Sequence, residues 1–321
     1  MKQKAHVIPC LAAWLAMLVA VTSPLTLTKA KYTGTYADAT AQFFLITSRG
    51  VVTGSATLAK GWWAIYLRGQ RGQTGREGGD TNGGFGDSGA GGVVKGMYYF
   101  DADTNVYAAT DVGPGPAPSN DAGKGGGATC LWKNSAVRPT TQGDANWIAI
   151  AAGGGGGSDD PDGGGGAGGS ITAPGSGGKV IAAGNDGAAG SGAAYAGKGA
   201  NGSGGNGAGG TNYDSPSGFL QGGGGYDGTG LSPNDAGGGG SGYGGGGGGG
   251  GAWNKVAGGG GGGSSMTNGM WTLPTGGAYA DADAYFAHNI SAPADYAASA
   301  VVCLIYLGDF GGENIRNPTY W

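Results

Sequence analysis

The side chains that most often carry enzymatic chemistry are sparse in this sequence. Two histidines occur among the 321 residues, His6 and His288, and no Gly-x-Ser-x-Gly turn accompanies them. A nucleophilic triad or a histidine-based metal site needs several such groups held close together. We therefore interpret His288 as a structural or surface residue, and we expect that the protein is not an enzyme.

Acidic residues gather at three places where their carboxylates could hold a calcium ion. The sequence Asp101-x-Asp103-x-Asn105 begins like a calcium-binding loop, but its sixth position is Val106 and its twelfth is Val112, where such loops have glycine and glutamate. We interpret this stretch as a turn between strands and expect no metal or cofactor. Two other groups are interpreted as solvated surface: Asp281 with Asp283, and Asp159, Asp160 and Asp162.

Cysteines and glycosylation motifs give a second set of candidate residues. Cys130 and Cys303 each lie in an apolar run. In an oxidising compartment they could form a disulfide, or they could be two buried free thiols that pack as small apolar groups. Asn201 and Asn289 each begin an Asn-x-Ser motif, so both are candidate N-glycosylation sites.

The first 30 residues predict export. Two lysines precede an uncharged stretch, residues 7–28, and small residues end at Ala30, as expected of a cleaved signal peptide. The alternative is a retained membrane anchor, as in a virion or envelope protein, because the stretch is long enough to span a bilayer. Both interpretations place the remaining chain outside the cytosol, either secreted or on a surface.

Glycine accounts for 81 of the 321 residues, yet the composition is not that of a disordered chain. Hydrophobic residues make up 39% and charged residues 12%, whereas disordered chains are usually poor in aromatic residues and rich in charge. The chain should therefore fold. A net charge of −4 without a basic cluster argues against nucleic acid as a partner.

Short apolar runs on both sides of the longest glycine-rich block predict an all-β fold. The predicted strands are residues 42–47, 51–58, 62–67, 93–100, 105–112, 125–132, 146–152, 278–286 and 299–307. We expect residues 93–100 and 105–112 to form a hairpin. Because strands precede and follow the glycine block, a single β-sandwich should hold the ends of the block together.

These patterns divide the chain into four parts. A leader (1–30) precedes the first part of the sandwich (31–152), which carries a short glycine-rich insert (69–92); the main glycine block (153–263) and the closing strands (264–321) follow. Polyglycine can form extended threefold helices that rise about 3.1 Å per residue and have no internal hydrogen bonds. Such helices must bond to their neighbours. We therefore predict a bundle of them in residues 153–263, in which Gly247→Val should destabilise the fold.

Three stretches carry a resemblance to a known family. GGVVKGMYYFDADTNVYAATDVG (91–113), GGGATCLW (125–132) and NWIAIAAGGGGGS (146–158) precede glycine runs and a last apolar strand. This succession, over residues 43–307, resembles the glycine-rich extracellular domain of the anaplastic lymphoma kinase and leukocyte tyrosine kinase receptors. The resemblance implies a TNF-like, jelly-roll-type sandwich with an inserted polyglycine-II bundle. No kinase region is present, so receptor signalling is not implied. A weaker likeness is to the polyglycine-sandwich adhesins at phage tail-fibre tips.

The expected function is that of a rigid, non-enzymatic scaffold that presents loops for adhesion or protein binding. A component of a virion or envelope would fit this expectation. An elastic matrix protein with disordered glycine loops is the alternative. The expected partners are a protein or glycan ligand or further copies of the chain, and a membrane only through residues 7–28. Aromatic residues in turns could make the contacts or could seal the bundle; the candidates are Tyr213, Tyr226, Tyr243, Trp253 and Trp271.

Overall fold

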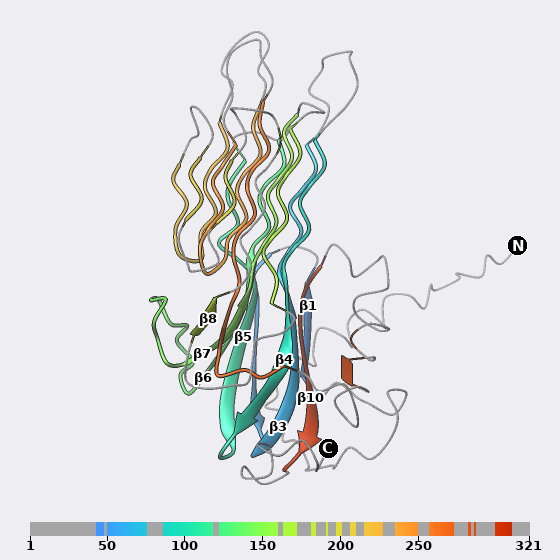
Figure 1. Cartoon of the computed structure of the whole chain (residues 1–321), viewed down its shortest axis with the longest axis vertical. Helices are drawn as coiled ribbons and strands as arrows, with labels where there is room; N and C mark the ends of the chain where they lie inside the picture. Colours follow the sequence, from blue (N-terminus) through green and yellow to red (C-terminus); the bar gives the residue numbers. More distant parts are fainter. Residues whose placement is uncertain are drawn as a thin grey trace, which may run out of the picture.

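The protein is built almost entirely from strands and extended chain (Figure 1). The computed structural model describes residues 43–47, 50–75, 86–117, 122–159, 163–171, 181–183, 191, 197–200, 206–209, 215–226, 235–249, 257–272, 282–283, 286 and 299–309. Within these ranges, helix is confined to Ala282, Asp283 and Phe286. The predicted all-β class is confirmed. The leader lies outside the described residues, and no described helix is long and apolar enough to cross a membrane.

The strands form two antiparallel sheets. One has the order β1-β10-β3-β4 and the other β2-β5-β6-β7-β9-β8. Their bounds are β1 Phe43–Thr47, β2 Val52–Leu58, β3 Gly61–Arg68, β4 Val93–Phe100, β5 Thr104–Val112, β6 Ala128–Lys133, β7 Trp147–Ala151, β8 Ile181–Ala183, β9 Met266–Asn268 and β10 Ala300–Gly308. Eight of the nine predicted strands occur within about three residues of these bounds, and β8 and β9 were not predicted.

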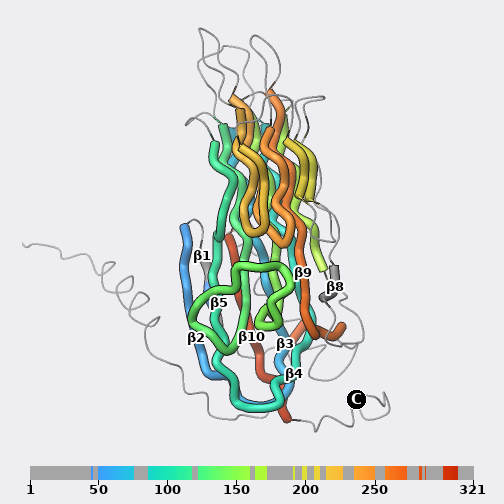
Figure 2. The backbone as a smooth tube through the Cα atoms, turned by 90° about the vertical axis from the view of Figure 1, so that its left-hand side faces the viewer, coloured from blue at the N-terminus to red at the C-terminus, as the bar shows by residue number. Residues whose placement is uncertain are grey.

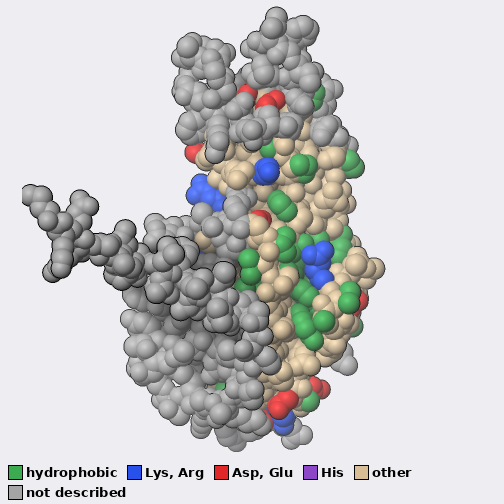
Figure 3. Space-filling view, turned by 180° about the vertical axis from the view of Figure 1, so that it is seen from behind, with side chains coloured by type: hydrophobic (Ala, Val, Ile, Leu, Met, Phe, Trp, Pro, Cys, Tyr) green, Lys and Arg blue, Asp and Glu red, His purple; other side chains and the backbone are tan. Residues whose placement is uncertain are grey.

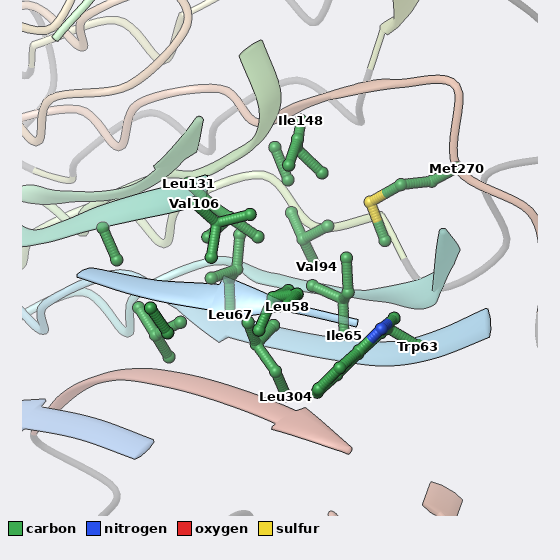
Figure 4. Packing of buried hydrophobic residues seen from close by; sticks show 14 of the residues in the cluster. Leu58, Trp63, Ile65, Leu67, Val94, Val106, Leu131, Ile148, Met270 and Leu304 are labelled. Carbon is green, nitrogen blue, oxygen red and sulfur yellow. The ribbon is translucent and has the colours of Figure 1, made fainter. Parts of the chain in front are cut away.

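The two sheets share one hydrophobic core (Figure 4). Strand β3 supplies Trp63, Ile65 and Leu67 to it, and the facing sheet supplies Val106 from β5 and Leu131 from β6. The alternate residues of β3 pack on the outer face of its sheet in a second cluster. Both faces of β3 are therefore buried, which explains why its sequence is apolar without alternation.

The predicted hairpin of β4 and β5 is wrong, because the two strands lie in different sheets. Val94 of β4 and Val106 of β5 both point into the shared core, from opposite sides. The turn at Asp101–Asp103 therefore carries the chain from one sheet to the other. Local turn chemistry indicated a reversal here, but packing of the two apolar faces decided the pairing.

The predicted strand at residues 278–286 is also corrected where the structure describes it. Ala282 and Phe286 are helical and almost fully buried in the cluster on the outer face of β3 and β10. Alanine has the highest helix propensity, and this preference outweighs the alternating pattern in the sequence.

Glycine-rich segments run side by side beyond one end of the sheets, along the long axis of the molecule (Figures 1 and 2). We call the following segments the glycine array: 69–75, 86–92, 113–117, 123–127, 152–158, 163–170, 197–200, 206–209, 222–226, 235–249 and 257–264. Backbone hydrogen bonds join these segments to one another. The array is thus wider than residues 153–263, because residues 69–75 and 86–92 and two segments between β5 and β6 also belong to it.

Candidate functional site

Residues 153–158, which follow β7, are enclosed on every side within the glycine array. The N–H groups of Gly153 and Gly156 donate to the carbonyls of Ser241 (2.7 Å) and Gly238 (2.8 Å) in one neighbouring segment. Gly154 donates to a second segment and Gly155 to a third. The direction of bonding therefore repeats every three residues, so the segment turns through one full rotation in three residues.

The carbonyl groups of the same segment complete its surroundings. Every one of residues 153–158 also accepts a hydrogen bond from the backbone of a neighbouring segment. The six neighbours are residues 69–75, 86–92, 123–127, 163–170, 235–241 and 257–264. No backbone polar group of residues 153–158 is left without a partner, which buried backbone requires.

The neighbouring backbones lie so close that only glycine fits inside. A Cβ on Gly155 would be 1.9 Å from the carbonyl oxygen of Gly260, and one on Gly157 would be 1.9 Å from that of Gly86. Gly247, the predicted test position, shows the same crowding, with a Cβ placed 2.0 Å from the oxygen of Ala208. The contacts are backbone atoms on both sides, so no side chain can move away to make room.

Edge segments of the array need glycine at only one position in three. In GQRGQTG, residues 69–75, a Cβ at Gly69, Gly72 or Gly75 would lie 1.9, 2.0 or 1.7 Å from a carbonyl oxygen of residues 152–158. Thr74, between two of these glycines, is exposed. The same spacing recurs at residues 86, 89 and 92. This period of three was present in the sequence and could have assigned both segments to the array.

A buried carboxylate ties the sheets to the array. Asp111, at the end of β5, has a φ of 53° and is 4% exposed. It accepts hydrogen bonds from the N–H groups of Gly50, at 2.6 Å, and Gly127, at 2.9 Å. The pairing of β5 with β6 shifts register between Ala109 and Val112, which turns this residue out of the regular strand. Asp111 therefore fastens the starts of β2 and β6 where the chain enters the array. The sequence analysis did not single it out.

Buried serines satisfy further backbone groups at the same junction. The hydroxyl of Ser241 donates to the carbonyl of Val112 and accepts from the N–H of Ala128. Ser265 accepts from the N–H of Ala152 at 2.9 Å. The serine hydroxyls thus provide partners for backbone N–H and C=O groups at the strand ends that the neighbouring strands do not bond.

The candidate aromatic contacts are only partly described. Tyr213 and Trp253 lie outside the described residues, and Tyr226 is half-buried. Tyr243 is 8% exposed and packs edge-on against Phe219, and Trp271 packs edge-on against Trp62. Tyr243 and Trp271 therefore cover the outer faces of the two sheets. Whether these residues contact a ligand or only seal the structure is not decided by this packing, and the contact role stays a prediction.

The two described cysteines are free, buried thiols. Cys130 lies in the cluster on the outer face of β6, and Cys303 lies in the cluster on the outer face of β10. Because the shared core separates these faces, the alternative of a disulfide between them is not realised. The candidate glycosylation residues Asn201 and Asn289, together with His288 and Asp281, lie outside the described residues. Asp283 forms an ion pair with Lys95 at 2.7 Å.

Burial should make both thiols inert in the folded protein. It raises the pKa of Cys130 to about 12 and raises that of Cys303 further, so neither forms the reactive thiolate. We expect no modification of either residue by iodoacetamide at pH 8, but full modification in guanidinium, as measured by peptide mass spectrometry. Since unfolded thiols ionise near their ordinary pKa, these groups should also lower stability as the pH rises above 9. Modification of either residue in the native state would contradict the burial.

The described residues contain no cluster of histidine, cysteine or acidic side chains that could hold a metal ion. They do contain a groove of about 590 Å³ at the end of β4. A second groove of about 580 Å³ crosses β2, β5 and β6, near the exposed Val51 and Val137. Seen from behind, the molecule carries hydrophobic side chains gathered around basic ones about midway along its length (Figure 3).

The sequence matches no protein-family model and no curated protein. The family resemblance described above therefore stays a prediction.

Proposed function

We propose that this protein is a rigid, non-enzymatic scaffold for structure and recognition that works outside the cytosol. In this proposal, a jelly-roll-type β-sandwich carries a bundle of polyglycine-II helices formed by the glycine array. The carrying observation is the bonding of residues 153–158 to six neighbouring segments. A segment held on every side by backbone hydrogen bonds cannot bend or extend without breaking them.

The helix type is supported by the repeat in these hydrogen bonds. Polyglycine II has three residues per turn and leaves all its N–H and C=O groups to bond outward. Residues 153–158 donate to three neighbouring segments and accept from three others, and both patterns repeat every three residues. A lattice of such helices requires this arrangement. The sandwich is supported by the core that the two sheets share.

The rigidity of the scaffold would favour a role in recognition. Binding costs less conformational entropy when the binding surface is already ordered. The predicted export signal would place the protein in the secreted or surface-exposed class, where a stiff platform can serve adhesion or the assembly of a coat. Its ligand would be a protein, a glycan or another copy of the chain.

Trypsin distinguishes the scaffold from an elastic protein with disordered glycine loops. Arg71 and Lys124 lie in the glycine array, and each is followed by a glycine. The N–H of Gly72 donates to Gly89 and that of Gly125 to Gly115, so the backbone at both bonds is already paired within the array and cannot pair with a protease. We expect the native protein to resist cleavage at both sites and the urea-unfolded protein to be cut at both, as identified by mass spectrometry. Rapid cleavage at both sites in the native state would favour the elastic alternative.

A further inference from the structure

The groove at the end of β4 lies far from the glycine array and is lined by residues from both sheets. Tyr98 and Asp101 line it from the end of β4, and Lys133 and Asn134 from the end of β6. Asn146, just before β7, and Asn268, at the end of β9, line the rest. We call this the Lys133 groove. Its volume, about 590 Å³, lies in the range of small-molecule sites.

Lys133 is held in a fixed position in this groove and keeps hydrogen-bonding capacity. Its Nζ donates to the hydroxyl of Tyr98 at 2.6 Å and lies 5.2 Å from the centre of the Tyr98 ring. Tyr98 in turn packs against Phe100, with ring centroids 4.7 Å apart. An ammonium group has three donors, and the hydroxyl of Tyr98 can still donate its own proton. The pair thus offers several donors in a preset arrangement.

Three amide side chains add both donors and acceptors. The amide of Asn134 donates to the oxygen of Asn146 at 3.3 Å, which leaves the NH₂ group of Asn146 to donate elsewhere. Asn268 donates to the carbonyl of Trp147 at 3.1 Å, and its own oxygen can still accept. These bonds orient two of the amides from behind.

The chemistry of the lining favours a ligand rich in hydroxyl groups. Each sugar hydroxyl both donates and accepts, and so matches amides, a phenol and an ammonium together. Among the described lining residues, Lys133 is the single cation and Asp101 a carboxylate, so the charge is balanced. A phosphate or nucleic acid ligand would call for several cations. An apolar ligand would leave these polar groups desolvated without partners.

We propose that the Lys133 groove binds a saccharide. This inference rests on the proposed recognition function and names the class of its ligand. Lys133 and Tyr98 would bind hydroxyl oxygens, and the amides of Asn134 and Asn146 would bind neighbouring hydroxyls. The groove opens beside the turn at Asp101–Asp103, so a chain of several sugar units could extend beyond it.

The test uses the full chain, fluorescently labelled, on an array of immobilised oligosaccharides. The strongest binder is then titrated as the free oligosaccharide in a calorimeter against Lys133→Met, Asn146→Ala and Lys124→Met. The last variant is a matched control, because it makes the same substitution at an exposed lysine of the glycine array. We expect binding to weaken about tenfold or more in Lys133→Met and about fivefold in Asn146→Ala, and to stay unchanged in Lys124→Met.

Two results would overturn the inference. One is no oligosaccharide bound at millimolar concentration, and the other is binding that Lys133→Met and Asn146→Ala leave unchanged. If Lys133→Met does not fold, as judged by its melting temperature, Asn146→Ala decides. Trypsin resistance is measured on the same samples, at Arg71 in all of them and at Lys124 in all except Lys124→Met. A groove that binds no sugar in a trypsin-resistant protein refutes this inference alone, whereas loss of that resistance in the wild type refutes the proposed scaffold.

Discussion

Gly155→Ala is expected to lower the free energy of unfolding by about 3 kcal/mol or more, although it adds a single methyl group. The added Cβ would lie 1.9 Å from the carbonyl oxygen of Gly260, well inside the distance that real Cβ atoms keep. This clash can be relieved only if residues 153–158 and 257–264 move apart. That movement would break the hydrogen bond from the N–H of Gly260 to the carbonyl of Gly156, at 2.9 Å, and weaken those of the adjoining segments.

The measurement is thermal unfolding followed by circular dichroism, with an expected fall in melting temperature of roughly 6–12 °C. Gly164→Ala is the matched control. A Cβ there would meet the Ser191 hydroxyl at 3.3 Å and no backbone atom closer than 3.6 Å. Because alanine also restricts the unfolded chain, this control should change stability by less than about 1 kcal/mol. Equal effects of the two substitutions would show that the array is not packed as described.

The number of successive glycines in a segment depends on whether the segment lies inside the array or at its edge. Inside, at residues 153–157, all three sides of the chain face other backbones, so glycine is needed at successive residues. At an edge such as residues 69–75, a Cβ would clash with a neighbouring backbone at every third residue only, so other residues fill two places in three. A tether without packing would show no such difference. The distribution of glycine thus reports which segments are interior.

Much of the sheet architecture could be predicted from the sequence, because its strands are short apolar runs bounded by turns. Strand β4 was predicted at Val93–Phe100, as found, and β3 was predicted at residues 62–67 and spans Gly61–Arg68. Which strands pair could not be predicted. The turn that joins β4 and β5 suits a hairpin as well as it suits a crossing from one sheet to the other. Only the facing core residues decide between them.

The candidate site was harder to predict for a different physical reason. Interior positions of the array carry no side chains, so the sequence does not show which segments are neighbours. Segments 69–75 and 86–92 were assigned to a separate insert because the period of three in their glycines was not used. Lys133, Asn146 and Asn268 come from separate strands of one sheet and meet only after folding. The role of Asp111 depends on a register shift in the pairing of β5 with β6, which the sequence around Asp111 does not indicate.

Asp111→Ala is expected to destabilise the protein by about 3 kcal/mol, because one buried and one partly exposed N–H group lose the same carboxylate acceptor. Those N–H groups belong to Gly50 and Gly127. Alanine also tolerates the φ of 53° less well than aspartate does. Asp111→Asn keeps one side-chain oxygen and the conformational tolerance, so it should lose less stability. Asp111→Gly separates the two causes, since it removes the acceptor but suits the backbone angle.

The matched control for this position is Asp103→Ala. Asp103 also accepts a backbone hydrogen bond, from Lys60 at 2.8 Å, but it is exposed. Water can replace that bond, so its loss should cost less than about 1 kcal/mol in urea unfolding. If Asp111 fastens the sheets to the glycine array, Asp111→Ala should also make the bond after Lys124 sensitive to trypsin, because residues 123–127 lead directly into β6. Loss of stability without that sensitivity would assign Asp111 to the sheet alone.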